Sequence, residues 1–301
     1  MLNVNELNMK RVERIVRFTI KEDVWTGDIT SDAVLDAELE VDAVILSRQK
    51  GIVCGMAVAE KAFNVADPDI RFRPMVKDGE KVEPDREIAF IEGNAQAILR
   101  VERVALNFLS YMSGIATETG KFVELVKDTG VKIFDTRKTL PLHRYLQKYA
   151  VRIGGGHNHR WGLWDMVLIK DNHLRAFGMQ RKTRNTESIV KNIIRAARED
   201  VQKNILVEIE VETLKECEYA LSEKPDVIML DNMKPDLVVK AVELRKKLAL
   251  EKTVKFEVSG GITLDNVRSY ASTGVDIISS GSLTSRPNSL DFSLEVILRD
   301  K

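Results

Sequence analysis

The middle of the chain gathers basic side chains and histidines in one short stretch, between residues 135 and 173. Its basic members at key positions are Arg137, Lys138, Arg160 and Lys170. The first two come shortly after the apolar run 131–134, the last directly follows the run 166–169, and Arg160 comes soon after a triple glycine. Short buried strands that end in charged residues are typical of an α/β active site. The pattern predicts a cationic cavity for an anion with several carboxylates or phosphates; the alternative is a solvated basic face.

Two glycine-containing sequences near the end of the chain predict a phosphate site. Ser259-Gly260-Gly261 and Ser280-Gly281 each follow a strand-like run. Glycine-rich loops after the late strands of a barrel, beside a helix N-terminus, offer free backbone N–H groups to a phosphate. Glycines are common at barrel turns without any ligand, so the occurrence of two such loops at consecutive strand ends favours the phosphate interpretation.

Two acidic residues, Glu210 and Asp231, lie about one βα unit apart and are expected to be neighbours at the same end of a sheet. Paired carboxylates beside a phosphate loop can hold a divalent metal or accept hydrogen bonds from ribose hydroxyls. They also favour positive charge that develops on a sugar ring. The alternative is a structural ion pair with Lys138 or Lys170, which does not exclude the functional role.

The sequence His157-x-His159 could share a metal ion. The pair follows three glycines and precedes Arg160, whose charge repels a cation. We therefore disfavour a zinc site at this position.

Strand and helix patterns alternate from residue 131 onward and predict the elements that position these side chains. The strand-like runs are 131–134, 166–169, 205–209, 227–230, 254–258 and 276–279, and the helical stretches are 189–198, 214–221, 237–248 and 264–272. Six such units imply parallel strands with right-handed crossovers, in a doubly wound sheet or a (β/α) barrel. An incomplete barrel is favoured because nearly every strand ends in a functional-looking residue.

The first part of the chain has a different character. Leu7, Arg11, Ile15 and Phe18 recur at helical spacing, and residues 22–30 are predicted to be a loop with a helix-capping Asp or Thr. A small antiparallel sheet follows, with strands predicted at 41–46, 51–55, 70–72 and 88–91, a helix at 57–64, and two helices between 95 and 129.

Composition limits the classes of function. Basic and acidic residues number 46 each, so the net charge of +0 argues against nucleic-acid binding through bulk charge. The two cysteines suit a reducing cytoplasm, and we expect no signal peptide, no membrane span and a cytoplasmic location.

The chain resembles the quinolinate phosphoribosyltransferase family, also called nicotinate-nucleotide pyrophosphorylase (carboxylating). The matching segments are 22–30, 102–107, Thr136–Pro141, Gly154–Arg160, Lys170–His173, Glu208–Val211, Leu230–Asn232 and Ser259–Gly261, in family order. One departure is Ser282-Leu283-Thr284-Ser285-Arg286, where the family usually has Ala-Leu-Thr-His-Ser. The chain therefore lacks the histidine that the family usually has in this loop.

The resemblance implies an α/β fold with an N-terminal α/β sandwich domain at 1–112 and an incomplete α/β barrel at 113–287. The C-terminal tail, about 288–301, is a candidate to pack on the first domain. It also implies at least a homodimer with shared sites, in which Arg103 reaches the neighbouring subunit's site. The resemblance also assigns six residues to substrate binding: Thr136, Arg137, Lys138, His159, Arg160 and Lys170. All of these except Thr136 are expected to contact the two carboxylates of quinolinate.

For the second substrate, phosphoribosyl pyrophosphate, the resemblance assigns Glu210 and Asp231 to the ribose and to Mg²⁺. It assigns Ser259, Gly260, Gly261, Ser280 and Gly281 to the 5′-phosphate. Lys138, Glu210 and Asp231 are the expected catalytic residues, with no tightly bound organic cofactor.

The implied reaction transfers the phosphoribosyl group to quinolinate with loss of CO2, giving nicotinate mononucleotide for NAD biosynthesis. A related phosphoribosyltransferase-like protein with another acceptor, a metal-dependent barrel hydrolase and a sensor of phosphorylated sugars are the alternatives.

Overall fold

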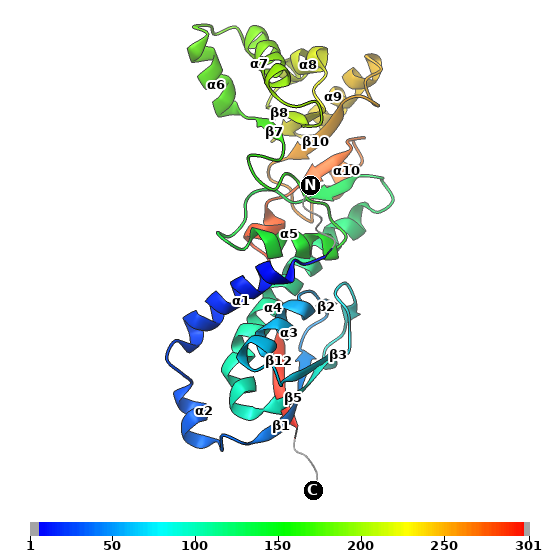
Figure 1. Ribbon diagram of the computed structural model, residues 1–301. Helices are drawn as coiled ribbons and strands as arrows, with labels where there is room; N and C mark the ends of the chain where they lie inside the picture. Colours follow the sequence, from blue (N-terminus) through cyan, green and yellow to red (C-terminus); the bar gives the residue numbers. More distant parts are fainter. Residues whose placement is uncertain (1–5, 298–301) are drawn as a thin grey trace. The chain divides into compact units, whose positions relative to one another are not determined.

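The computed structural model describes residues 6–297 and divides them into two compact units (Figure 1). The sandwich unit comprises residues 6–120, Pro141–Gly155 and 286–297. The barrel unit comprises Lys121–Leu140 and Gly156–Ser285. The boundary expected between residues 112 and 113 falls inside a single helix, α4 (Ala95–Val126), because its helical pattern continues without interruption through that point.

The sandwich unit is built on a four-stranded antiparallel sheet in the order β12-β1-β5-β3. Its strands are β1 (Glu40–Ser47), β3 (Arg71–Pro74), β5 (Arg86–Asn94) and β12 (Phe292–Ile297), with a separate pair β2 (Gly51–Ile52) and β4 (Lys81–Val82). Its helices are α1 (Met9–Val24), α2 (Ile29–Val34), α3 (Met56–Ala66), α5 (Arg144–Ile153) and most of α4. The predicted strands and the predicted helix at 57–64 are confirmed in type, whereas β4 and α2 were not predicted.

Strand β12 comes from the far end of the chain and pairs with β1 at one edge of this sheet, as Figure 1 shows. The pairing runs from Ser47 opposite Phe292 to Asp42 opposite Ile297. Phe292 is buried, so the strand adds an apolar side chain to the core as well as backbone hydrogen bonds. Residues 298–301 of the expected tail lie outside the described residues.

Helix α1 is present as predicted, but its buried face is not the expected one. Val12 and Val16 are fully buried, whereas Phe18 is 71% exposed. The guanidinium of Arg11 lies over the ring of Tyr145. Arg11 therefore makes a cation–π contact and is not part of the buried core of the unit. The core stripe is therefore shifted by one residue from the predicted one.

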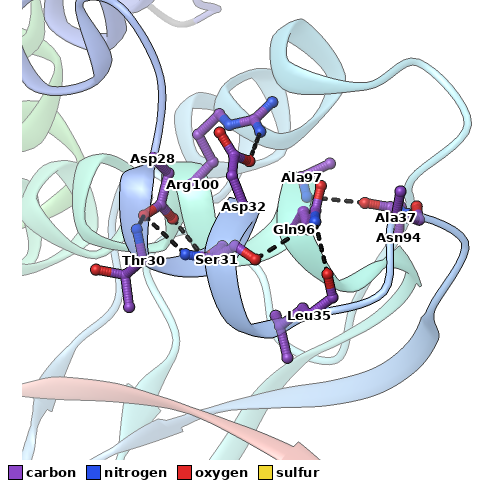
Figure 2. A network of polar contacts seen from close by, with 10 residues as sticks. All are labelled: Asp28, Thr30, Ser31, Asp32, Leu35, Ala37, Asn94, Gln96, Ala97 and Arg100. Atoms are coloured by element: carbon purple, nitrogen blue, oxygen red, sulfur yellow. Dashed lines mark hydrogen bonds and ion pairs between the residues drawn. The ribbon is translucent and has the colours of Figure 1, made fainter.

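The predicted capping role of the 22–30 loop is confirmed by Asp28. Its carboxylate accepts hydrogen bonds from the N–H groups of Thr30 and Ser31 and so caps α2 (Figure 2). The same network ties α2 to the start of α4, where the Gln96 amide donates to the carbonyl of Leu35 and Arg100 pairs with Asp32.

The barrel unit contains six parallel strands with helices between them. The strands are β6 (Lys132–Phe134), β7 (Val167–Ile169), β8 (Val207–Val211), β9 (Val227–Asp231), β10 (Lys255–Ser259) and β11 (Ile277–Ser279). The helices are α6 (Asp171–Gln180), α7 (Thr186–Asp200), α8 (Leu214–Glu223), α9 (Pro235–Lys247), α10 (Val267–Ala271) and α11 (Ser282–Ser285). All six predicted strands and all four predicted helices of this part are confirmed.

The strand order is β6-β11-β10-β9-β8-β7, so the first strand of the unit lies beside the last. This circular order is that of a barrel, and the sheet is open between β6 and β7. His157 extends the sheet at this opening through a parallel bridge to Phe134, with its ring stacked on the phenyl ring at 5.3 Å between centroids. The predicted incomplete barrel is therefore confirmed.

Two aspartates fasten the N-terminal ends of the barrel strands. Asp226, just before β9, accepts from the backbone N–H of Val207 and pairs with Arg198. Asp276, just before β11, accepts from the N–H of Phe256 and pairs with the buried Arg245. This repeated arrangement stabilises the end of the barrel at which the strands begin. Function is expected at the opposite end, where the strands end.

Across residues 6–297, none of the helices combines the length and apolar character needed to cross a bilayer.

Candidate active site

The carboxyl ends of the barrel strands bring together most of the predicted site residues. Thr136, Arg137 and Lys138 follow β6, Lys170 follows β7, and Glu210 and Asp231 lie in the last two positions of β8 and β9. Ser259 ends β10, and Ser280 and Gly281 follow β11. Because these strands are parallel and adjacent in register, their ends open on one mouth.

The turn after β6 packs directly on the turn after β11. A Cβ atom on Gly281 would come within 2.8 Å of Cδ of Lys138 and 3.4 Å of the Thr136 hydroxyl. The Thr284 hydroxyl, on α11, donates to the Lys138 carbonyl at 2.7 Å. The cationic turn and one of the glycine loops are thus parts of the same structure, and the missing side chain at Gly281 leaves room for the side chain of Lys138.

The loop after β10 has the left-handed backbone that glycine favours. Gly260 has φ +91° and Gly261 φ +63°. Among the described residues, the N–H groups of these two glycines have no hydrogen-bond acceptor. The Ser280 hydroxyl donates to the carbonyl of Ile262 at 3.3 Å, which connects this loop to the one after β11. Consecutive free N–H groups in such a turn form an anion-binding concavity.

Glu210 and Asp231 are neighbours, as predicted from their spacing. Nζ of Lys170 lies 2.6 Å from a carboxylate oxygen of Glu210. Burial raises the pKa of Asp231, and the adjacent Glu210 charge raises it further, against the lowering effects of Asn232 and Lys170. Both the structural ion pair and the carboxylate pair that the sequence left as alternatives are therefore present.

Arg137 and Arg160 form a pair of closely spaced cations. Burial lowers the pKa of Arg160, and the charge of Arg137 lowers it further. One amino nitrogen of Arg160 donates to the carbonyl of Met166 at 3.1 Å, while Nε of each arginine is buried and has no partner among the described residues. Two closely spaced guanidinium groups, each with a buried and unused Nε donor, are suited to carboxylates.

Three acidic side chains lie inside the barrel below this mouth. Asp135 follows β6, Glu208 lies on β8 and Glu257 on β10, and all three are fully or almost fully buried. Alternate strands of a barrel contribute side chains to the same interior layer, which accounts for the grouping. Burial raises the pKa of Glu257 to about 8, and the charge of Glu208 adds to the shift. We call Asp135, Glu208 and Glu257 the acidic layer.

His159 meets the acidic layer and is only 8% exposed. Its Nε2 lies 3.0 Å from a carboxylate oxygen of Glu208 and 3.6 Å from one of Glu257. Its backbone N–H donates to Asp135 at 2.8 Å. The imidazole thus faces the barrel interior. The predicted contact between His159 and the acceptor stays a prediction.

His159, Glu208 and Glu257 present ligand atoms within 4.8 Å of one another, as a metal site would. However, Nδ1 of His159 accepts a hydrogen bond from the backbone N–H of Arg160 at 2.8 Å. Nε2 must then carry the hydrogen, so it has no lone pair for a metal. The tautomer therefore disfavours a metal here, and His157, stacked on Phe134, is not part of the group.

Arg103 belongs to α4 in the sandwich unit, and its side chain is 64% exposed, with Glu102 as an ion-pair partner at 3.8 Å. The predicted role of Arg103 in a neighbouring subunit stays a prediction.

The acidic layer contains the residues that sequence reasoning missed. The sequence patterns single out Glu210 on β8 but neither Glu208 nor Glu257. The available signal was a glutamate between two apolar residues within a predicted strand, Val207-Glu208-Ile209 or Phe256-Glu257-Val258. Such a residue is costly to bury and so usually has a specific partner.

An incomplete parallel barrel with cations, paired carboxylates and free glycine N–H groups at its mouth defines an enzyme-like protein that binds small, multiply charged anions. The particular family follows from sequence comparison. The C-terminal domain model of quinolinate phosphoribosyl transferase matches residues 115–295, and the N-terminal domain model matches residues 28–113. The chain therefore belongs to the quinolinate phosphoribosyl transferase family.

Individual relatives agree with this assignment. The chain is 41% identical to the probable nicotinate-nucleotide pyrophosphorylase (carboxylating) of Methanocaldococcus jannaschii, over 94% of this chain and 96% of that protein. It is 38% identical to the nicotinate-nucleotide pyrophosphorylase (carboxylating) of Mycobacterium leprae, over 93% and 95%. The crystal structure of NadC from Streptococcus pyogenes superposes with a TM-score of 0.89 at 34% identity, over 98% and 99% of the two chains.

Proposed function

We propose that this chain transfers the phosphoribosyl group of phosphoribosyl pyrophosphate to quinolinate, with decarboxylation to nicotinate mononucleotide. The observation that carries the proposal is the pair Arg137 and Arg160, whose buried Nε groups have no partner in the described chain and whose charges repel each other. A dianion placed between them relieves this repulsion and fills the unused donors. Quinolinate, with two adjacent carboxylates, is such a dianion.

The arginines orient the acceptor as well as attract it. A guanidinium group binds a carboxylate with two parallel hydrogen bonds, which fixes the plane of the pyridine ring. Lys138, at the same turn as Arg137, adds a third positive charge. We infer that these contacts hold the ring nitrogen towards the anomeric carbon of the sugar, which removes much of the entropic cost of the reaction.

The glycine loops provide for the other substrate. The free N–H groups of Gly260 and Gly261 support binding of the 5′-phosphate, with Ser259, Ser280 and Gly281 beside them. Glu210 and Asp231 are positioned for the ribose hydroxyls. Their negative charge also stabilises the positive charge that develops on the ring as pyrophosphate leaves.

Glu210 and Asp231 also fit a magnesium ion that accompanies phosphoribosyl pyrophosphate. The negative charge of Glu210 makes ionisation of Asp231 less favourable, as the raised pKa of Asp231 indicates, so a cation between them would be stabilising. Carboxylate oxygens are also the ligands that Mg²⁺ prefers. When bound, the ion would neutralise charge on the pyrophosphate leaving group.

Decarboxylation follows from the chemistry of the product ring. Once the ring nitrogen is bonded to the ribose it is positively charged. When the neighbouring carboxylate leaves as CO2, the electron pair of the broken bond stays on the ring carbon, where the adjacent positive nitrogen stabilises it. That carbon then takes a proton from water, which gives the ring of nicotinate mononucleotide.

We further propose that the enzyme acts as at least a dimer in which Arg103 serves the neighbouring subunit's site. Its exposed guanidinium on α4 supports this proposal. The cytoplasmic location also stays a prediction, since the plant relatives are named as chloroplastic or mitochondrial proteins.

Turnover of quinolinate and phosphoribosyl pyrophosphate with Mg²⁺ tests the proposed function. We expect CO2 and nicotinate mononucleotide in equal amounts, and no product when nicotinate replaces quinolinate. Binding of phosphoribosyl pyrophosphate without any product from quinolinate would mean that the acceptor is a different acid.

The substitution Arg137→Ala tests the acceptor site separately. We expect quinolinate affinity to fall about 100-fold, the loss of one charge-assisted bidentate contact, with phosphoribosyl pyrophosphate affinity nearly unchanged. Calorimetry with each substrate measures both. Arg195→Ala, which removes an exposed arginine paired with Glu223 on the outer helices, is the matched control. Equal losses for both substrates would refute the assignment of Arg137.

A further inference from the structure

The acidic layer contains one side chain whose burial the proposed chemistry does not account for. Glu208 is fully buried, and neither carboxylate oxygen has a hydrogen-bond donor in the described chain that meets normal geometry. Its closest polar neighbour is Nε2 of His159, at 3.0 Å. Removing a carboxylate from water without full compensation is costly, so a residue kept in this state is a candidate for a functional role.

The hydrogen bond at Nδ1 of His159 determines what Glu208 meets. Since Nδ1 accepts from the N–H of Arg160, the imidazole is the tautomer with its hydrogen on Nε2. Nε2 lies 3.0 Å from a carboxylate oxygen of Glu208, a close polar contact without normal hydrogen-bond geometry. Glu208 therefore stabilises both this tautomer and the inward position of the ring.

The ring in turn connects Glu208 to the cationic mouth. Arg160 is held at its backbone N–H by His159 and at its guanidinium by the carbonyl of Met166. The preceding backbone is fixed by Asp135, which accepts from the N–H of His159 and the amide of Asn158. The imidazole connects the backbone N–H of Arg160 to Glu208, whereas Asp135 holds the two residues before Arg160.

We propose that Glu208 is a positioning residue: through the imidazole of His159 it sets the backbone of Arg160, and with it the guanidinium that receives the acceptor's carboxylate. This inference rests on the proposed function, because it assigns Arg160 to the acceptor. Glu208 does not touch substrate, and its effect is confined to the acceptor half of the site.

Glu257 also lies near the imidazole of His159 but does not share the role proposed for Glu208. It lies farther from Nε2 than Glu208 does, 3.6 Å against 3.0 Å. Burial and the nearby charge of Glu208 raise the pKa of Glu257, so its charged form is less favourable than that of an ordinary glutamate. The positioning role therefore belongs to Glu208.

Two substitutions distinguish the polar contact between Glu208 and His159 from simple filling of space by the side chain at position 208. Glu208→Met keeps the length of the side chain and removes the oxygen that faces Nε2, whereas Glu208→Gln keeps an oxygen that can face it. We expect Glu208→Met to raise the KM for quinolinate about tenfold, the loss of one polar contact with a charged group. The KM for phosphoribosyl pyrophosphate stays near that of the wild type, and Glu208→Gln recovers most of the quinolinate affinity. Glu243→Met, on the exposed face of α9, is the control.

The tautomer of His159 gives a readout that does not depend on turnover. In ¹⁵N NMR of histidine-labelled protein, with His159→Gln for assignment, the wild type should show protonated Nε2 and unprotonated Nδ1. Glu208→Met should lose this single tautomer and Glu208→Gln should retain it, in samples whose unfolding transition shows that they are folded.

Each outcome decides the proposal. An unchanged His159 spectrum in Glu208→Met, or equal rises in the two KM values, would overturn it. So would a Glu208→Gln variant as impaired as Glu208→Met. If the wild type does not turn over quinolinate, the proposed function fails. The spectrum then decides alone whether Glu208 positions His159.

Discussion

Gly260 and Gly261 are adjacent residues with the same backbone handedness and different surroundings. Their φ angles are +91° and +63°. A Cβ atom at Gly260 would lie 2.3 Å from Oδ1 of Asn232, whereas one at Gly261 would meet nothing within 4 Å. The two positions therefore share the cost of a left-handed residue, and only Gly260 adds a steric collision with the residue that follows Asp231.

This difference predicts unequal effects of the same substitution. Gly261→Ala should cost about 1 kcal/mol of stability through backbone strain alone. Gly260→Ala should cost more and should weaken phosphoribosyl pyrophosphate binding at least about tenfold, because the loop must move away from Asn232 and its N–H groups move with it. Denaturant unfolding and calorimetry measure the two effects. Similar losses in both variants would show that Asn232 yields without disturbing the loop.

Single residues also show how far sequence reasoning reached. Glu210 and Asp231 could be placed together because both end strands that are consecutive in the sequence. The inward turn of His159 could not, because it depends on Asp135, Glu208 and the Arg160 N–H, which come from different strands and a loop. Strand alternation predicts which face a strand residue takes, but gives no such rule for a loop.

At the scale of elements, the barrel strands could be predicted because each concentrates apolar residues in a short segment with a turn on either side. The short elements α2, β4 and α11 could not, since few of their own residues carry a pattern. Strand β12 pairs with β1, whose residues lie roughly 250 positions earlier in the chain, for example Ile297 with Asp42. Local propensity carries no information about such a partner.

The aspartates at the starts of the strands give a prediction at this scale. Asp276 accepts hydrogen bonds from Arg245, Lys255 and the N–H of Phe256, and it thereby joins β10, β11 and α9. Asp276→Asn leaves Arg245, only 4% exposed, without its counter-charge. We expect a loss of about 3 kcal/mol in the free energy of unfolding, as for other broken buried pairs.

The loss should depend on pH in a defined direction. Burial alone would raise the pKa of Asp276, but its hydrogen bonds and the charge of Arg245 outweigh this and lower it. A carboxyl with a lowered pKa contributes stability above its unfolded value of about 3.9, and this contribution is lost as the pH falls through the folded value. The difference between wild type and Asp276→Asn, measured by denaturant unfolding, should thus shrink in acid. A difference independent of pH would mean that the charge of Asp276 is not involved.

At the scale of the whole molecule, the candidate site residues are unequally divided. Thirteen of the proposed site positions are in the barrel unit, from Thr136 to Gly281, whereas Arg103 alone is in the sandwich unit. If Arg103 completes a neighbouring subunit's site, each active site needs one barrel unit and the other chain's α4. A symmetric dimer then contains two such mixed sites.

Mixing two inactive variants tests this arrangement. Arg103→Ala and Lys138→Ala should each lose activity as pure proteins. After subunit exchange, half of the dimers contain one chain of each kind, and one of their two sites has both residues intact, so about a quarter of wild-type activity should return. A mixture of Lys138→Ala with Arg137→Ala is the control, because both changes fall in the same unit and no site escapes them. If Arg103 instead serves its own chain, every site in the mixed dimer lacks one residue and no activity returns.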